Sequence, residues 1–168
     1  MKKLIILIGT IGSGKSTLAK KFSKSDYVTV SRDAMRYMIK SGEYCFNPVY
    51  EPCIKSINLF AIEEFAKKGF NVVVDECCLN KSLRKSITSI GKRYKYAIYG
   101  ILMPKISMKE SVARRLKNNH GKNTKKTWES VYKMFKTISN KVTKREGFYK
   151  IIELQNNYDF KKLLKDLE

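Results

Sequence analysis

Residues 9–17 read Gly-Thr-Ile-Gly-Ser-Gly-Lys-Ser-Thr, and this short run is the strongest functional signal in the chain. It fits the pattern G-x-x-x-x-G-K-[ST], with Gly9, Gly14, Lys15 and Ser16 at the four fixed positions. Glycines let the backbone fold around an anion with its N–H groups pointing inward, and a following helix N-terminus adds a favourable dipole. The run therefore predicts a phosphate-binding loop.

The flanking sequence has the context that such a loop requires. Residues 4–8 form an apolar run typical of a buried parallel strand, and residues 16–22 have the pattern of a helix. The alternative is a glycine-rich turn that matches the pattern by chance, and such a turn would need neither the strand before it nor the helix after it. Lys15 is expected to reach the β- and γ-phosphates of a nucleoside triphosphate, and the Ser16 hydroxyl to bind Mg²⁺. The residues predicted to contact the nucleotide are Gly9, Ile11, Gly12, Ser13, Gly14, Lys15, Ser16 and Thr17.

Composition indicates a globular protein with an anionic partner. The 168 residues carry a formal net charge of +20, with 43% hydrophobic and 30% charged residues. A nucleic acid is the first candidate for the partner and a membrane surface the second. Because 28 of the 35 basic residues are lysine, a general composition bias is the alternative source of the charge.

Other functional classes find little support in the sequence. No stretch approaches the length needed to span a membrane, so no membrane partner is expected. The four cysteines form no C-x-x-C pair and His120 is the sole histidine, which argues against a zinc site. Free thiols are typical of a cytoplasmic protein, which is the location we predict.

Strand and helix patterns alternate along the chain, which predicts an α/β fold with a parallel sheet covered on both faces. We expect a single domain over residues 1–168. The expected strands are 4–8, 27–30, 70–74, 94–103 and 149–154, and the expected helices are 16–22, 34–39, 49–68, 81–91, 107–118, 128–142 and 160–167.

A basic, polar segment lies between the two helices expected at 107–118 and 128–142, and it resembles a lid over phosphates. We place this lid at about residues 114–127. The stretch 105–150 around it holds 14 basic and 3 acidic residues, a net charge of +11. Such concentration argues against composition bias as the whole explanation.

Acidic residues follow two of the expected strands, at the sheet edge where ligands bind in parallel α/β folds. Phosphoryl transfer to a hydroxyl needs a carboxylate to accept the proton, and Asp33 is the first candidate. The alternative for Asp33 is a helix N-cap. Asp75 or the adjacent Glu76 is expected to hold Mg²⁺, directly or through water. Both residues stay open as candidates.

Several of these segments together resemble the kinase domain of phage polynucleotide 5′-hydroxyl kinases. The resemblance rests on residues 1–17, on Ser31-Arg32-Asp33-x-x-Arg36, and on the apolar strand that leads to Leu79-Asn80, and it covers about residues 1–125. It implies a P-loop kinase fold with strand order 2-3-1-4-5. It also implies that Asp33 is the general base, that Arg36 holds the phosphate beside the attacking nucleoside, and that Glu76 is the acidic residue after the third strand.

The match weakens in the lid. The family carries two arginines there that stabilise charge on the transferring phosphate, and Arg115 matches the first. The second falls on Asn119 or His120. The alternatives are that Lys122, Lys125 or Arg114 supplies this charge, or that the lid is reorganised. The family's separate phosphatase domain has no counterpart in 168 residues, so a kinase-only form is expected.

These patterns predict an ATP- or GTP-dependent kinase of the 5′-hydroxyl of DNA or RNA, with Mg²⁺ as cofactor. A kinase of a small-molecule hydroxyl is the alternative, and a nucleotide-dependent nucleic-acid-binding protein without catalysis ranks below it. Lys81, Arg84 and Lys85 are candidate contacts to a nucleic-acid backbone, with a solvated helix face as the alternative. Trp128 is expected to pack in the core.

Overall fold

The computed structural model describes residues 1–118 and 123–168. A five-stranded sheet lies at its centre, with all strands parallel in the order β2-β3-β1-β4-β5. This confirms the predicted α/β class and the predicted strand order. The strands are β1 (Lys3–Ile8), β2 (Val28–Val30), β3 (Val72–Val74), β4 (Ala97–Leu102) and β5 (Lys150–Glu153).

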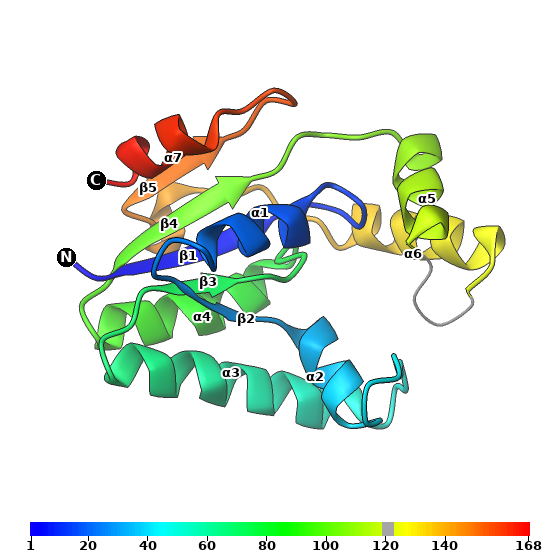
Figure 1. Ribbon diagram of the computed structural model, residues 1–168, viewed down its shortest axis with the longest axis horizontal. Helices are drawn as coiled ribbons and strands as arrows, with labels where there is room; N and C mark the ends of the chain where they lie inside the picture. Colours follow the sequence, from blue (N-terminus) through cyan, green and yellow to red (C-terminus); the bar gives the residue numbers. More distant parts are fainter. Residues whose placement is uncertain (119–122) are drawn as a thin grey trace.

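Helices cover both faces of the sheet, with α1 and α7 on one face and α3 and α4 on the other (Figure 1). The pair α5–α6 lies beyond the carboxyl ends of the strands. The helices are α1 (Lys15–Phe22), α2 (Arg32–Met38), α3 (Glu51–Lys67), α4 (Lys81–Arg93), α5 (Met108–Lys117), α6 (Lys125–Thr137) and α7 (Phe160–Asp166), and a short 3-10 turn, η1, spans Lys144–Glu146.

The central strand explains why the sheet is buried on both sides. Successive side chains of a strand point to opposite faces. In β1, Leu4 and Ile6 pack with α3 and α4, whereas Ile5 and Leu7 pack with α1 and α7. All four residues are fully buried. The continuous apolar run 4–8 was therefore a correct sign of a parallel strand.

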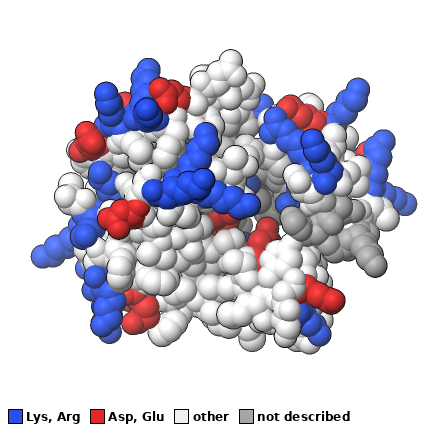
Figure 2. All heavy atoms as spheres, viewed as in Figure 1, with Lys and Arg blue, Asp and Glu red and all other residues white. Residues whose placement is uncertain are grey.

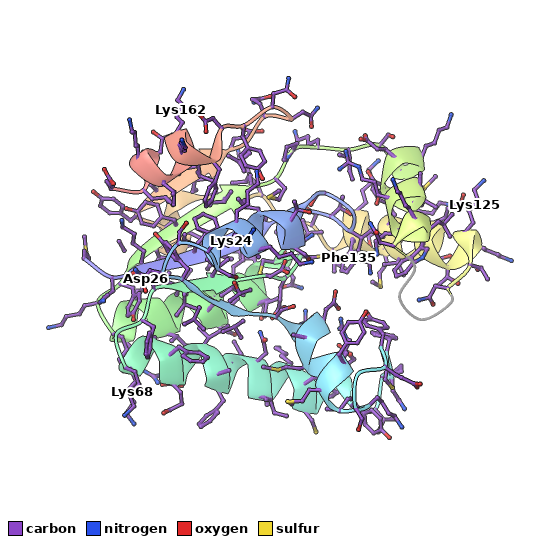
Figure 3. All side chains as sticks on the ribbon, viewed as in Figure 1. Lys24, Asp26, Lys68, Lys125, Phe135 and Lys162 are labelled. Carbon is purple, nitrogen blue, oxygen red and sulfur yellow. The ribbon has the colours of Figure 1, made fainter. Side chains whose placement is uncertain are left out.

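The sheet has two chemically different ends. The carboxyl ends of the strands face the phosphate-binding loop and the α5–α6 pair, while the turns that carry Asp26 and Lys68 lie at the opposite end (Figure 3). Lys125 lies at the outer end of α6 in the same view. No helix in the described ranges 1–118 and 123–168 is long and apolar enough to cross a membrane.

Two expected elements, α6 and β4, have clearly different bounds in the structure. Helix α6 begins at Lys125 because Thr124 caps it, and it ends at Thr137 instead of residue 142. The next residues leave the helix because the Asn140 N–H donates to the Leu79 carbonyl, 3.0 Å away. Strand β4 begins at Ala97 and not at 94, since the intervening Lys95 has a φ of 58° and makes a turn.

The buried face of α3 also differs from the expected one. Ile54 is buried, as the apolar pattern of residues 49–68 predicts, and so are Ile62 and the polar Asn58. Ile57 and Phe60, which we expected on the same face, are 43% and 65% exposed. The side of α3 that carries Asn58 faces the sheet, because Asn58 donates a hydrogen bond to the buried carboxylate of Glu76 there.

Candidate active site

The phosphate-binding loop has the backbone conformation that its glycines predict. Gly12 and Gly14 have φ angles of 69° and 94°, in the left-handed region that favours glycine. Gly14 is the N-cap of α1, so the loop leads directly into a helix N-terminus. Lys15 is buried, and its Nζ donates to the carbonyl oxygens of Gly9 at 3.0 Å and Thr10 at 2.6 Å. The loop is thus already folded around its lysine.

Helix α5 holds this loop from behind. Ser111 Oγ donates to the Ile11 carbonyl at 2.7 Å, and Arg114 Nη1 donates to the Gly12 carbonyl at 3.0 Å. A Cβ on Gly12 would lie 2.9 Å from the Ser111 carbonyl oxygen, so only glycine fits this approach. Ile11 itself packs with Trp128 in a small apolar cluster. Sequence reasoning missed Ser111, because no motif marks a serine that bonds a loop 100 residues away.

The described part of the lid contains two arginines, Arg114 and Arg115, with different contacts. Arg115 stacks on Trp128, with its Cζ 4.3 Å from the ring centroid. Burial raises the pKa of Tyr37 and of Tyr44, which belong to α2 and the loop after it, and the Arg115 charge offsets part of both rises. Arg115 therefore lies between the lid and the α2 side. Arg114 instead contacts the loop and pairs with Glu110 Oε1 at 2.5 Å.

Three other lid candidates, Asn119, His120 and Lys122, lie outside the described residues. Lys125 is exposed and pairs with Glu129 on its own helix, with 3.9 Å between Nζ and Oε1. The pairing follows the i, i+4 spacing of a helix surface. In this conformation Lys125 thus points along α6.

Asp75 is the acidic residue beside the phosphate-binding loop. Burial raises its pKa, and hydrogen bonding to Ser16 together with the charge of Lys15 offsets part of the rise. The charge of Asp33 raises the same pKa, so the two aspartates share one region. A hydroxyl and a carboxylate are hard oxygen ligands that fit Mg²⁺, which binds one or two protein groups plus phosphate oxygens in such sites.

Glu76 points away from the loop and into the protein. It is 6% exposed, accepts a hydrogen bond from Asn58 Nδ2, and pairs with Arg32, whose Nε lies 2.7 Å from Glu76 Oε2. Burial raises the pKa of Glu76, and the Arg32 charge acts against the rise. The two adjacent acids thus face different partners, Asp75 the phosphate-binding loop and Glu76 helices α2 and α3.

An alternating row of charges runs outward from Glu76, and we call it the ion-pair chain. Its five members are Glu76, Arg32, Glu51, Arg36 and Asp33. Arg32 Nη1 lies 3.9 Å from Glu51 Oε2, which places Arg32 between two carboxylates. The chain connects the buried end of β3 with the two residues that the sequence marked for the acceptor.

At the outer end of the chain, Arg36 orients Asp33. Its Nε and Nη2 bind the two carboxylate oxygens of Glu51 at 2.8 and 2.6 Å, and its Nη1 binds Asp33 Oδ1. Tyr44 Oη donates to the same Oδ1 at 3.4 Å. Within the described part of the chain, Asp33 Oδ2 carries no hydrogen bond, so this oxygen is available to a ligand.

Asp33 is not the cap of α2. Ser31 precedes the helix as N-cap, and Asp33 lies in the first turn. Its neighbour Tyr44 stays protonated, because burial and then the charge of Asp33 raise the Tyr44 pKa to about 12. A protonated hydroxyl can donate to the carboxylate at neutral pH. Sequence reasoning missed Tyr44 and Glu51, whose roles arise only when the loop after α2 folds back.

Arg84 differs from both sequence interpretations, since it is neither exposed nor a surface contact. The side chain is fully buried and binds Glu146, with Nε 2.7 Å from Oε2. It also donates to the carbonyls of Cys78 and Leu79 at 3.0 and 2.7 Å. Arg84 therefore fixes the turn that follows β3 and the acidic pair.

This fold and this site define a P-loop kinase. The sequence matches the family described as "AAA domain" over residues 4–141, and the chain belongs to that family. A protein of Autographa californica nuclear polyhedrosis virus, named as a bifunctional polynucleotide kinase/RNA ligase, is 31% identical over 152 residues, which are 83% of this chain and 22% of that protein.

Two further comparisons involve RNA-related proteins. The L-seryl-tRNA(Sec) kinase of Methanococcus maripaludis is 32% identical over 95 residues, which are 53% of this chain and 36% of that protein. In the solved structure of the Pnkp1/Rnl/Hen1 RNA repair complex, one chain superposes with a TM-score of 0.60 at 26% identity, covering 82% of this chain and 45% of that one. The chain thus spans less than half the length of each of these relatives.

Proposed function

We propose that this protein is a polynucleotide 5′-hydroxyl kinase, which transfers the γ-phosphate of ATP or GTP to the 5′-hydroxyl of DNA or RNA. The observation that carries the proposal is the position of Asp33. This carboxylate is near enough to Asp75 for its charge to raise the Asp75 pKa, is bound by Arg36 through Oδ1, and keeps Oδ2 available. Asp33 as a base and Arg36 as a cation lie side by side. This pair suits an acceptor whose hydroxyl is to be deprotonated and whose adjacent phosphate is to be bound.

Each residue then has a defined task. The loop 9–17 binds the donor phosphates, and Lys15 turns from the loop carbonyls to the β- and γ-oxygens. Asp33 Oδ2 accepts the proton of the attacking hydroxyl. Arg115 stabilises charge on the transferring group from the lid side. Mg²⁺, held by Ser16 and Asp75, would neutralise charge on the donor phosphates.

The contacts of Glu76 support an indirect role in this scheme. We assign it to positioning: it anchors Arg32, and through the ion-pair chain it fixes Arg36 and Asp33. A substrate-binding role for Glu76, predicted from the resemblance, would require the side chain to leave its buried partners. The viral relative and the RNA repair complex, by their names, support a polynucleotide acceptor.

A kinase of a small-molecule hydroxyl is the second candidate, and one observation favours it. Glu51 and Asp33 together take three of the five N–H groups of Arg36 and neutralise its charge. Less of that charge is then left for an acceptor phosphate. The two candidates differ in salt dependence, since binding through phosphate contacts weakens as salt rises.

The test is transfer of labelled γ-phosphate from ATP and from GTP to a 5′-hydroxyl oligonucleotide, in DNA and RNA forms. The same oligonucleotide with a 5′-phosphate is the control. Label on the 5′-hydroxyl form alone would establish the acceptor. Label on neither, with ATP binding intact, would overturn the proposal, and a panel of nucleosides and sugars would then separate a small-molecule kinase from a non-catalytic switch.

A further inference from the structure

A group of aromatic rings lies near Arg36, on α2 and on the loop that connects α2 with α3. The Arg36 Cζ lies 5.4 Å from the ring centroid of Phe46 and 6.0 Å from that of Tyr44. Tyr37 packs edge-to-face on Tyr44, with 5.4 Å between ring centroids. Two rings of the loop, Tyr44 and Phe46, thus lie against the guanidinium that also binds the Asp33 carboxylate.

Phe46 is the member of this group that remains open to solvent. Its exposed fraction is 61%, although a phenyl ring of this size usually packs into a core. One face of the ring approaches Arg36, which leaves the rest of the ring accessible. The surface over α2 and this loop also shows little charge, in contrast to the basic side chains over α1 and the α5–α6 pair (Figure 2).

The loop that carries Phe46 has a defined conformation. Ser41 and Gly42 have φ angles of 50° and 101° and reverse the chain, and the Gly42 N–H donates to the Tyr37 carbonyl at 2.9 Å. Asn47 Oδ1 then accepts from the Val49 N–H at 3.0 Å, just before α3 begins. These bonds hold Phe46 on the same side as the ion-pair chain.

We propose that Phe46 is the stacking platform for the 5′-terminal base of the acceptor nucleic acid. The inference rests on the proposed function, because it assumes that the acceptor hydroxyl lies at Asp33. Arg36 contacts both Asp33 and the Phe46 ring, so both border one guanidinium. A nucleoside with its 5′-oxygen at Asp33 Oδ2 has its sugar over Arg36 and its base at the Phe46 ring.

The chemistry predicts how this platform selects substrates. Every nucleobase has a π-face, so an aromatic platform accepts all four bases and rejects an end that has no base. Acceptors such as sugars, which carry a hydroxyl but no ring system, gain nothing from Phe46. The platform therefore distinguishes a nucleic-acid end from other hydroxyls without reading sequence.

The experiment compares two 5′-hydroxyl oligonucleotides that differ only at the first nucleotide, which carries a base in one and an abasic sugar in the other. For the native chain we expect the KM of the abasic oligonucleotide to be about tenfold higher, as the loss of one base–aromatic stack implies. Phe46→Ala should raise the KM of the base-bearing oligonucleotide about tenfold, with an unchanged kcat, and leave the abasic one unaffected. Phe46→Trp, which keeps an aromatic ring, should keep the lower KM for the base-bearing oligonucleotide.

Phe60→Ala is the matched control, since Phe60 is an equally exposed phenylalanine (65%) that lies on α3. It should leave both KM values unchanged. If the ratio of the two KM values, abasic over base-bearing, is the same in the native chain and in Phe46→Ala, this inference is overturned and the proposed function stands. Phosphorylation of neither oligonucleotide by the native chain would overturn both, and an ATP-binding measurement on each variant checks that it is folded.

Discussion

The donor half and the acceptor half of this site are built in different ways. The donor half is a contiguous loop, residues 9–17, whose glycine conformations and lysine contacts lie within a few residues of one another. The acceptor half is assembled from β3, α2, the loop after α2 and the start of α3, and is joined by the ion-pair chain. Removing one residue therefore has a local effect in the first half and a transmitted effect in the second.

The largest expected effect comes from Arg84, which fixes the turn after β3. Arg84→Met should destabilise the fold by about 3–5 kcal/mol, because it leaves the Glu146 carboxylate buried without its partner. Thermal or urea unfolding measures the loss. Arg93→Met is the control, since Arg93 pairs with Glu63 on the surface at 63% side-chain exposure; a comparable loss in both variants would contradict a special role for the buried pair.

The Arg84–Glu146 pair also predicts a dependence on pH. Burial raises the pKa of Glu146, but the bonds from Arg84 and the Thr143 N–H outweigh this and leave the pKa below its ordinary value of 4.5. A carboxylate with a lowered pKa adds stability above that ordinary value and loses it as pH falls through the lowered one. The stability gap between the native chain and Arg84→Met should thus narrow below pH 4.5, and a gap that widens there would contradict the assignment.

Lys15→Ala tests the donor half alone. Loss of the ammonium should lower kcat by about 10²–10³-fold, the usual cost of one group that stabilises transition-state charge. The affinity for the acceptor oligonucleotide should not change. Lys24→Ala, in the exposed turn between α1 and β2, is the control and should keep full activity. Weaker acceptor binding in Lys15→Ala would show that the halves are not separate.

Glu51→Gln breaks the ion-pair chain in its middle. Arg36 then loses its bidentate partner and Asp33 its fixed orientation, so acceptor kcat/KM should fall about 10–100-fold, as small misplacements of reacting groups do. ATP affinity should stay the same. Glu43→Gln, on the exposed loop after α2, is the control. Unchanged kcat/KM would mean that Arg36 holds Asp33 without help.

The smallest expected effect is that of Ser111→Ala. The change leaves the buried Ile11 carbonyl without its donor, which costs about 1–3 kcal/mol of stability. Because the phosphate-binding loop loses its support from α5, ATP affinity should also fall a few-fold. Calorimetric unfolding measures the stability and ATP titration the affinity. The control is Ser86→Ala, a half-buried serine of α4 whose hydroxyl bonds only its own helix. Equal ATP affinity in both variants would show that the loop keeps its shape unaided.

The two halves also differ in how far the sequence predicted them. The loop 9–17 and the alternation of strands and helices follow from local patterns, while the strand order followed from the resemblance to phage polynucleotide kinases, and the fold has both. The roles of Asp33 and Arg36 stay predictions. Glu51 and Ser111 could not be predicted, because their partners are distant in sequence and their spacing matches no motif. Arg84 was misread for the same reason, since helical periodicity does not tell that a carboxylate 62 residues away will bury it.

The measurement that tests the account most directly compares Asp33→Asn with the native chain in two assays on the same preparation, γ-phosphate transfer to a 5′-hydroxyl oligonucleotide and ATP binding. Asparagine keeps the shape and can still accept the bond from Arg36, but it cannot take a proton. The account predicts that transfer falls by about 10²–10⁴-fold, the contribution of a general base, while ATP affinity stays the same. Transfer that survives, or ATP binding that falls in parallel, would contradict it.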